Sequence, residues 1–479
     1  MNARCCCGFT AALVFVVCPA VASAQVGVLD PVFGTEGRST VPFNPDGVLD
    51  WSLAAIAVEP DGGIIVVGSA ISSGMDTDFG VARLQPDGSL DDSFGVGGEQ
   101  RIPFNLGAEN TDQVAGVALQ EDGKIVVAGS AQYSSSDFDF AVARLNSDGG
   151  LDGSFGVGGL ATVWFDLGST NYDAAGGVAV QPDGKIVLAG TASSASAGNY
   201  EFAVARLDPS GALDPSFGAG GKTTIAFDLG GLNSDSGDDV AIQSDGKIVV
   251  AGWAETGASV TDFAAVRLNE DGSPDPGFGT GGKVVIPFDL GGYLTDEALA
   301  VAIQNDGRIV LAGAAEYTEN ADHDFAIARL LPNGSLDASF GFGGKASVPF
   351  DMGGDLADIA YDVMIQADGK IVVAGTVASG ADDTDFGVAR LLPDGSLDPG
   401  FGTVDGRIVV PFDLGGPGEL NFDDAYGAAI QGDHKVVVIG VVEEGANHDV
   451  LGVIRLTTDL IHLDGFDSGD TSAWSAAAP

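Results

Sequence analysis

The chain has 479 residues, of which 45% are hydrophobic, and a formal charge of -48 at pH 7. The apolar content excludes a wholly disordered chain, and so acidic a surface excludes nucleic acid and anionic lipid as partners, because it would repel both. All four cysteines (Cys5, Cys6, Cys7 and Cys18) lie in the N-terminal segment, so the rest of the chain can form no disulfide.

The N-terminal segment has the features of a secretory signal peptide. Residues 1–4 make a short basic start, residues 11–17 are apolar, and Ala22-Ser23-Ala24 is a small-residue cleavage site. The apolar run is too short to span a membrane, and no later stretch approaches a transmembrane helix. We therefore expect residues 1–24 to be removed and the mature protein to be secreted, whether it stays extracellular, at the cell surface or in the periplasm.

A block of about 61 residues then recurs seven times. Its first marker is a turn before an apolar run, clearest as Asp-Gly-Lys-Ile-Val-Val-Ala-Gly from Asp122. The turn returns from Asp183, Asp245, Asp306 and Asp368, and in looser form from Asp61 and Asp433. The second marker is Ser-Phe-Gly followed by Gly-Gly, with Phe33, Phe94, Phe155, Phe217, Phe278, Phe340 and Phe401 as its phenylalanines. A long, regular period indicates one supersecondary unit stacked on copies of itself.

The third repeat shows how one unit is built. Four short runs rich in β-branched residues, separated by Gly, Asp and Pro, predict strands at 178–181, 186–190, 202–207 and 222–227. No helical period is present. The first strand is short and rich in small residues, which suits the crowded axis of a ring, and the fourth is then the outermost. These features favour an all-β, seven-bladed β-propeller of four-stranded antiparallel blades, with an open β-solenoid as the alternative.

The two ends of the repeat region complement each other. The first strand, Arg38–Phe43, is an outer strand without a blade, and the last repeat supplies only the strands at 428–431, 435–442 and 450–456. We predict that Arg38–Phe43 pairs with Val450–Leu456, so that the N-terminal strand closes the ring and removes exposed edges. The predicted domains are the signal peptide (1–24), the propeller (25–456) and a C-terminal tail (457–479).

The repeat also resembles a known family. The runs Asp183–Gly190, Phe202–Leu207 and Leu213-Asp214-Pro215-Ser216-Phe217-Gly218 are similar to the delta-60 repeat family of secreted bacterial β-propellers. The resemblance covers nearly the whole mature chain. It implies a propeller fold and an exported setting, and it implies no particular activity.

An arginine ends the third strand of every repeat, and an aspartate follows eight residues later in the first six. A guanidinium fork suits a carboxylate, so we expect each pair to hold its own long connection; an anion-binding ring of arginines is the alternative. Ring closure would give Arg455 the partner Asp30, with Asp464 as a rival. The arginines are Arg83, Arg144, Arg206, Arg267, Arg329, Arg390 and Arg455, and the aspartates are Asp91, Asp152, Asp214, Asp275, Asp337 and Asp398.

A second acidic series precedes the inner strands, at Asp112, Asp173, Asp235, Asp296, Asp358 and Asp423. Seven residues before the first five stands another oxygen donor: Asn105, Asp166, Asp228, Asp289 and Asp351, with Asp413 as a looser copy. Oxygen ligands in a glycine-rich loop suit Ca²⁺, so the first five aspartates are candidate calcium ligands at one mouth of the channel. The alternative is that each carboxylate caps its turn by accepting main-chain N–H bonds.

Catalytic motifs are weak. The histidines are His323, His434, His448 and His462, and His323-Asp324 and His448-Asp449 occupy matching positions in two repeats. The variable segments between second and third strands (130–137, 191–199, 253–261, 314–322, 376–384 and 441–448) should lie on the same face as the acidic loops, and we expect a ligand there.

We predict a secreted scaffold that binds an extracellular protein or glycan. The alternative is an extracellular hydrolase or lyase acting on a polysaccharide. A cluster of non-repeated His, Tyr, Arg or acidic residues at the channel mouth would favour the enzyme, and a uniform ring of repeat residues would favour a scaffold or a metal site.

Overall fold

A computed structural model describes most of the repeat region. The described residues are 26–41, 51–71, 76–107, 111–134, 136–165, 167, 171–194, 198–258, 260–288, 290, 295–318, 322–350, 357–380, 383–414, 421–444 and 449–458. The predicted signal peptide and all but the first two residues of the predicted C-terminal tail lie outside them.

The described residues form an all-β structure without helices, so they contain no helix that could cross a membrane. Most strands belong to repeated four-stranded antiparallel sheets, five of which are separate. In hydrogen-bonded order these are β2 (Trp51–Val58), β3 (Ile64–Ile71), β4 (Thr77–Leu84), β5 (Glu99–Ile102); β6 (Asp112–Leu119), β7 (Ile125–Ser134), β8 (Asp137–Leu145), β9 (Leu160–Val163); β10 (Asp173–Val180), β11 (Ile186–Ser193), β12 (Tyr200–Leu207), β13 (Lys222–Ile225); β14 (Asp235–Ile242), β15 (Ile248–Gly257), β16 (Val260–Leu268), β17 (Lys283–Ile286); and β18 (Asp296–Ile303), β19 (Ile309–Thr318), β20 (Asp322–Leu330), β21 (Lys345–Val348).

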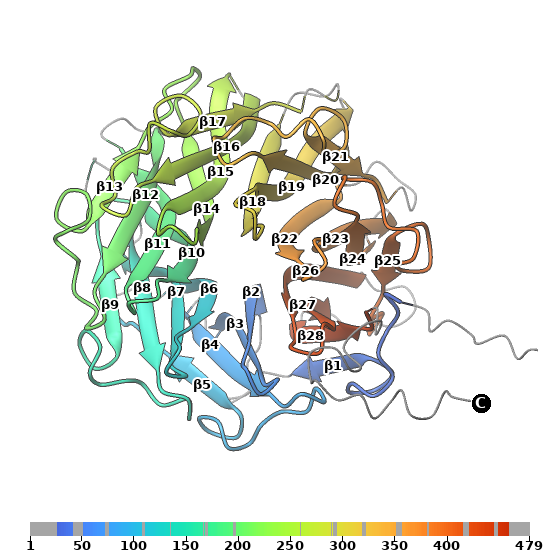
Figure 1. Cartoon of the computed structure of the whole chain (residues 1–479). Coiled ribbons are helices and arrows are strands. Elements are labelled where there is room, and N and C mark those ends of the chain that lie inside the picture. The colour runs from blue at the N-terminus through green and yellow to red at the C-terminus, as the bar shows by residue number, and fades with distance from the viewer. Residues whose placement is uncertain are drawn as a thin grey trace, which may run out of the picture.

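The remaining strands form one eight-stranded sheet, which gives six or more blade-like units in all. It contains β1 (Arg38–Val41), β28 (Asp449–Leu456), β27 (Val436–Glu443), β26 (Asn421–Ile430), β24 (Asp383–Leu391), β23 (Ile371–Gly380) and β22 (Ile359–Ile365) in this order, with β25 (Arg407–Val410) paired to β24. Figure 1 shows the sheets arranged around a central opening, as in a β-propeller.

The first strand of each repeat lies innermost, as predicted. We call β2, β6, β10, β14, β18, β22 and β26 the inner strands; residues from all of them line one central cavity. The inner strands are longer than predicted: β10 begins at Asp173, whereas the sequence indicated Val178. The prediction was too short because the small residues Ala174–Gly177 show no hydrophobic pattern. The predicted fourth strand ends early, at Ile225, because the amide of Phe227 binds the Asp235 carboxylate instead of a strand neighbour.

The turn that marks each repeat depends on a left-handed residue. In the second sheet Gly123 has φ +81°, a conformation that glycine adopts without a steric penalty. Asp122 accepts the amide hydrogen of Lys124 across the turn (3.2 Å). His434 replaces the glycine in the last copy and still adopts φ +66°, which explains why this copy was hard to recognise in the sequence.

The hydrophobic core is divided among the junctions between neighbouring sheets. One cluster, for example, combines Val187 and Phe202 of one sheet with Ile248 and Val266 of the next, around the fully buried Phe217. Each Ser-Phe-Gly phenylalanine is buried in the same way, so the second repeat marker is a packing element. Burying a ring of this size contributes roughly 2–3 kcal/mol.

The two ends of the repeat region pair as predicted. Strand β1 runs antiparallel to β28, from Arg38 opposite Ile454 to Val41 opposite Leu451. The predicted strand was longer, but residues 42–50 lie outside the described part. A further hydrophobic cluster contains Phe33 and Val41 near the N-terminus, Ile64 of β3, and Val437 and Leu451 near the C-terminus.

The repeated arginines tie each connection down and also reach the next sheet. Arg206 donates from Nε to Asp214 (2.9 Å), lies over the ring of Phe217 at 4.8 Å, and binds the main-chain oxygen of Glu270 in the following sheet. The Nε–carboxylate distance is 2.8–2.9 Å in all six predicted pairs. All of these arginines except Arg83 are buried, which leaves no ring of free guanidinium groups for an anion.

The last arginine uses the N-terminal aspartate, as predicted. Arg455 Nε lies 2.9 Å from Asp30 Oδ2, and its Nη1 binds the main-chain oxygen of Pro86, which follows β4. Lys435 adds a second cation to Asp30 at 3.2 Å. The same side-chain network therefore joins β28 to the segment before β1 and to the first four-stranded sheet.

Candidate functional site

A β-bulge in the inner strands places selected side chains in the central channel. In β6, β10, β14, β18, β22 and β26 the pairing with the second strand skips one residue at the same position. A bulged residue leaves the ladder and can point away from it. The skipped residues are Ala115, Gly176, Asp238, Leu299, Tyr361 and Tyr426, and all of them line the central cavity of about 180 Å³.

This lining breaks the repeat. Two small residues, one aliphatic residue, one acid and two tyrosines occupy equivalent places, and the position that follows them varies as well (Gly116, Gly177, Asp239, Ala300, Asp362 and Gly427). The ladder imposes no requirement on a residue that it skips. These side chains therefore give the channel a lining that differs from one inner strand to the next.

Two further acids in the channel have structural roles. Asp239 Oδ2 accepts the amide of Val301 in the neighbouring inner strand (2.8 Å), and Asp362 Oδ2 accepts the amide of Ala428 in the same way (2.8 Å). Each also binds the amide of the residue that follows it. These two carboxylates link neighbouring sheets, and we do not assign them to ligand binding.

Asp238 differs from them. Its Oδ1 accepts a hydrogen bond from Ser236 Oγ (3.0 Å), and Ser236 lies 2.7 Å from Thr191 Oγ1 on the neighbouring sheet. Because the Ser236 hydroxyl donates its hydrogen to the carboxylate, Thr191 is the donor in the second contact. The other oxygen, Asp238 Oδ2, is buried and has no hydrogen-bond partner among the described residues. A buried polar atom left in this state costs free energy.

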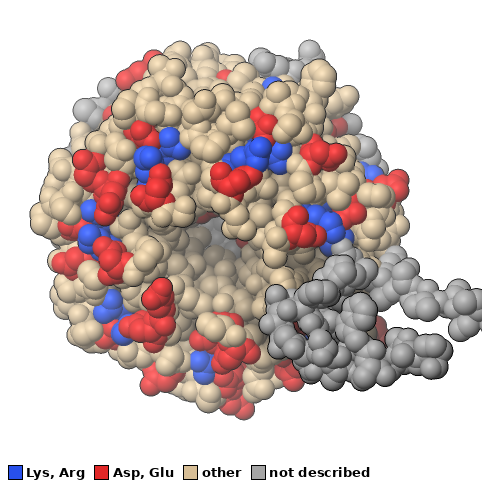
Figure 2. Space-filling view, in the orientation of Figure 1, with Lys and Arg blue, Asp and Glu red and all other residues tan. Residues whose placement is uncertain are grey.

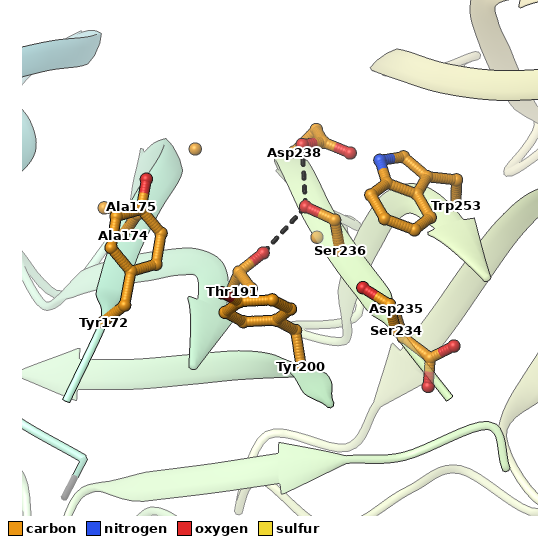
Figure 3. Close-up of a pocket in the computed structure, with 12 residues that line it drawn as sticks. Tyr172, Ala174, Ala175, Thr191, Tyr200, Ser234, Asp235, Ser236, Asp238 and Trp253 are labelled. Carbon is orange, nitrogen blue, oxygen red and sulfur yellow. Dashed lines mark hydrogen bonds between the residues drawn. The ribbon is translucent and has the colours of Figure 1, made fainter. Parts of the chain in front are cut away.

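The Thr191–Ser236–Asp238 chain forms the middle of a second cavity, of about 340 Å³, between β10 and β14. We call it the intersheet cavity. Figure 3 shows Tyr172 on one side of this chain and Trp253 on the other, with Tyr200 close to Thr191. Tyr172 and Tyr200 pack edge to face with ring centroids 6.1 Å apart. Gly176 and Asp238 line both cavities, so the intersheet cavity lies next to the channel.

The close approach of the two sheets at this place requires glycine. A Cβ atom on Gly176 would lie 2.6 Å from the main-chain oxygen of Asp238. No side chain fits there without moving β14, so the glycine allows the two inner strands to pack in direct contact.

Burial controls the acidity of the channel carboxylates. Burial raises the pKa of Asp238 to about 7; the hydrogen bond from Ser236 opposes the shift, and the negative charges of Glu297 and Asp239 add to it. Burial raises the pKa of Asp362 to about 7 and that of Asp239 to about 6, although main-chain hydrogen bonds oppose both shifts. A protonated fraction of these acids is therefore present near neutral pH.

A tyrosine pair lies on the opposite side of the channel lining. The rings of Tyr361 and Tyr426 pack edge to face at 4.9 Å, and Tyr426 Oη donates to Asp424 Oδ2 (3.4 Å). Burial, helped by the charges of Asp424 and Glu297, raises the pKa of Tyr361 to about 12. Both hydroxyls thus stay protonated and can act as hydrogen-bond donors.

The predicted calcium ligands are not brought together. Each of the five lies at or next to the start of its own inner strand and accepts the main-chain amide of a phenylalanine eight residues earlier, at 2.6–2.9 Å. Of their proposed partners, Asn105, Asp228 and Asp413 have positive φ, and Asp166, Asp289 and Asp351 lie outside the described residues. Within the described residues no group of three or more His, Cys, Asp or Glu side chains could hold a metal ion. The hydrogen bonds expected for turn capping are thus formed by Asp112, Asp173, Asp235, Asp296 and Asp358, and calcium binding stays a prediction.

Other predicted site features fared unevenly. His323 lies in strand β20 rather than in a loop, and its counterpart His448 lies outside the described residues. Several variable segments are partly strand, since β15 continues to Gly257 and β16 starts at Val260. Thr191 and Trp253, at the starts of two of these segments, line the intersheet cavity; ligand binding on this face stays a prediction.

The sequence analysis missed Asp238, Trp253 and the tyrosine pair. Their signal is a departure from the repeat. The position of Trp253, opposite the inner strand, holds small or medium-sized residues in the other copies. These are Ser69, Ser130, Thr191, Ala314, Thr376 and Val441.

The visible basic residues form no free patch. Figure 2 shows one face, on which Lys and Arg atoms adjoin Asp or Glu atoms around the central opening. Within the described turns, Lys185 binds Asp183 at 3.0 Å and Lys247 binds Asp245 at 2.9 Å. Such pairing leaves no surface suited to a polyanion on this face.

Comparison with protein families supports a β-propeller family. Six segments match a family model described as "Domain of unknown function (DUF5122) beta-propeller", a description that does not carry the name delta-60 repeat. The matched segments are residues 59–94, 120–155, 181–217, 243–278, 304–340 and 366–401. They cover the turn, the second and third strands and the Ser-Phe-Gly connection. The inner strands, with their bulges, fall between them.

The comparisons with individual proteins are distant. No curated protein matches the chain. A protein of unknown function from Dyadobacter fermentans is 10% identical (TM-score 0.42; 88% of this chain and 98% of that chain). The β-propeller domain of the trilobed protease from Pyrococcus furiosus is 12% identical (0.40; 84% and 96%). An alpha-L-arabinanase from Penicillium chrysogenum is 9% identical (0.42; 90% and 98%). Similarity at this level carries no information about activity.

Proposed function

We propose that the chain is a secreted, closed, seven-bladed β-propeller that binds a saccharide at the face bearing the intersheet cavity. The blade number is supported by the weak link inside the eight-stranded sheet. Only two parallel residue pairs, Asp383 with Asn421 and Thr384 with Phe422, join β24 to β26. Single parallel bridges occur at the same place between separate sheets, such as Thr77 with Thr111. On this basis β22–β25 is one blade and β26–β28 with β1 is another.

The proposed secretion rests on the sequence. Residues 1–24 carry the signal-peptide features, and the cysteines lie only in that segment. A large repeat core needs no disulfide outside the cell.

The observation that carries the binding proposal is the set of aromatic residues that break the repeat at one cavity. Tyr172, Tyr200 and Trp253 gather around a hydroxyl–carboxylate chain between two sheets. Aromatic faces suit the apolar C–H faces of a sugar ring, and hydroxyl and carboxylate oxygens suit its hydroxyl groups. The cavity of about 340 Å³ is at the lower end of the range for small-molecule sites.

A glycan-array screen of the mature protein tests this proposal. We expect binding to a restricted group of glycans, and we expect Trp253→Ala to abolish it. Trp164→Ala is the matched control, because Trp164 is about half exposed and does not line either cavity. If no glycan binds, or if both variants bind like the parent, the saccharide proposal is wrong.

A hydrolase is the second candidate, and a specific observation favours it. The channel contains non-repeated acids and tyrosines, which is the arrangement expected for an enzyme. Asp238, of which a fraction is protonated near neutral pH, could serve as a general acid, and Glu297 supplies a second carboxylate whose charge acts on it. Release of reducing ends from a polysaccharide panel would show hydrolysis, and Asp238→Asn should reduce kcat at least about a hundredfold. Binding without release would leave the scaffold function.

A further inference from the structure

We infer that the saccharide carries a free amino group, and that the intersheet cavity seats its ammonium nitrogen against Asp238 and its carbon ring against Trp253 and the two tyrosines. This inference rests on the proposed saccharide binding and specifies the ligand class.

The charges around the cavities favour a cation. None of the residues that line the intersheet or the central cavity is Lys, Arg or His. The lining contains Asp235, Asp238, Asp239 and Asp362, on a chain whose formal charge is -48. Three of these four have main-chain hydrogen bonds that satisfy a carboxylate oxygen, and Asp238 has only the bond from Ser236. An anionic sugar would meet like charge on every side.

Asp235 Oδ1 and Asp238 Oδ2 are both buried without a partner among the described residues. Asp235 also accepts a main-chain amide, so the less satisfied carboxylate, and the better match for an ammonium group, is that of Asp238. An –NH₃⁺ group brings three donors together with the opposite charge. A charge-assisted hydrogen bond is about twice as strong as a neutral one. A sugar hydroxyl could donate to this oxygen but would leave the negative charge uncompensated in a buried place.

The aromatic residues supply the second half of the recognition. A cation near the face of a tryptophan or tyrosine ring gains roughly 0.5–2 kcal/mol. Figure 3 shows Trp253 on the Asp238 side of the Thr191–Ser236–Asp238 chain and Tyr172 on the far side of Thr191. A nitrogen at the carboxylate would therefore lie on the Trp253 side, and the tyrosines would contact the rest of the ligand.

The test is isothermal titration calorimetry of the mature protein with a glucosamine trimer and with the N-acetylated trimer of the same skeleton. These two probes differ in charge and acetylation while sharing ring geometry. A third probe, methylammonium, carries the –NH₃⁺ group without a sugar. All titrations are run in about 0.2 M NaCl, which screens the general attraction of a cation to an acidic surface.

We expect the glucosamine trimer to bind at least about tenfold more tightly than the acetylated trimer, and Asp238→Asn to remove that preference. Asp122→Asn is the charge-matched control, because it deletes the same charge in an exposed turn. Trp253→Leu, which leaves every carboxylate in place, provides a second variant should Asp238→Asn fold poorly, as judged by circular dichroism; it should weaken both trimers.

The outcomes separate the two proposals. If the acetylated trimer binds as well as the free amine and Trp253→Leu abolishes both, saccharide binding stands and the ammonium inference fails. If methylammonium binds in a manner dependent on Asp238 and neither trimer does, the ammonium site stands and the saccharide is wrong. An equal loss in Asp238→Asn and Asp122→Asn overturns the inference, and so does the absence of binding by all three probes.

Discussion

Cutting the ion pair between Arg455 and Asp30 tests whether the N-terminal segment closes the ring. We propose the variant Asp30→Asn, which keeps the size of the side chain and removes its charge. Asp214→Asn is the matched control in the middle of the chain, because Arg206 and Asp214 form the same pair with the same Nε–Oδ2 distance of 2.9 Å. Both aspartates are buried.

The expected magnitude follows from burial. Removing one member of a buried pair leaves the other charge without compensation and costs about 3–5 kcal/mol. For a cooperative unit of roughly 430 residues, an unfolding entropy of about 2.1 cal/mol/K per residue sums to about 0.9 kcal/mol/K, so Tm should fall by about 3–5 °C. In a closed ring the two variants lose the same amount. If the N-terminal segment were only appended, Asp30→Asn would release it locally and leave Tm unchanged.

Differential scanning calorimetry at pH 7 measures both variants against the parent. Burial tends to raise the pKa of Asp30, but the Val32 amide, Lys435 and Arg455 outweigh it and lower the pKa below its ordinary value. A lowered pKa gives stability that is present above the ordinary pKa and is lost as pH falls through the folded-state value. The difference between Asp30→Asn and the parent should therefore shrink in acid. An Asp30→Asn variant that melts within 1 °C of the parent at pH 7, while Asp214→Asn melts lower, would refute closure through this segment.

Three further predictions concern the ends, the channel and the acidic turns. Deleting residues 25–43 should lower Tm by many degrees and speed hydrogen exchange in β28, whereas unchanged melting and exchange would contradict strand closure. Burial raises the pKa of Asp238 to about 7 and that of Asp239 to about 6, so the folded state holds protons more tightly than the unfolded chain and its stability should fall as pH rises from about 4 to about 7. In melting curves recorded over this pH range, Asp238→Asn should make the fall less steep. A variant profile parallel to that of the parent would count against the raised pKa of Asp238. Millimolar Ca²⁺ should raise Tm above chelator and above NaCl of equal ionic strength if the aspartates preceding the inner strands bind it; an equal effect of NaCl would leave them as turn caps only.

The sequence predicted the parts of this protein that recur. Comparison of the complete repeats with the incomplete ones at the two ends predicted three features. These are the strand order, the pairing of Arg38 with the last repeat and the Arg455–Asp30 contact. Repetition makes such features visible because the same spacing must satisfy the same hydrogen bonds many times over.

The candidate site could not be predicted in this way, because it consists of exceptions. Asp238 follows a run of Gly and Ser that carries no strand pattern, and a bulge that shifts pairing by one residue has no signature in the hydrophobic alternation. Trp253 was placed in a variable loop, although it lies on a strand. Aligning the copies and looking for the residue that does not fit would have found both.

The bulge also separates two kinds of information along the inner strands. Residues before and after the bulge pair in the strand ladder, whereas the skipped residue faces the channel and is constrained by what binds there. Substitutions at Ala115 and Leu299 should therefore alter specificity at little expense in folding. Tyr361 and Tyr426, which pack against each other, and Gly176, which β14 approaches closely, are the exceptions. A chain built by duplication thus retains, in each copy, one position at which selection or a designed library can act independently of the scaffold.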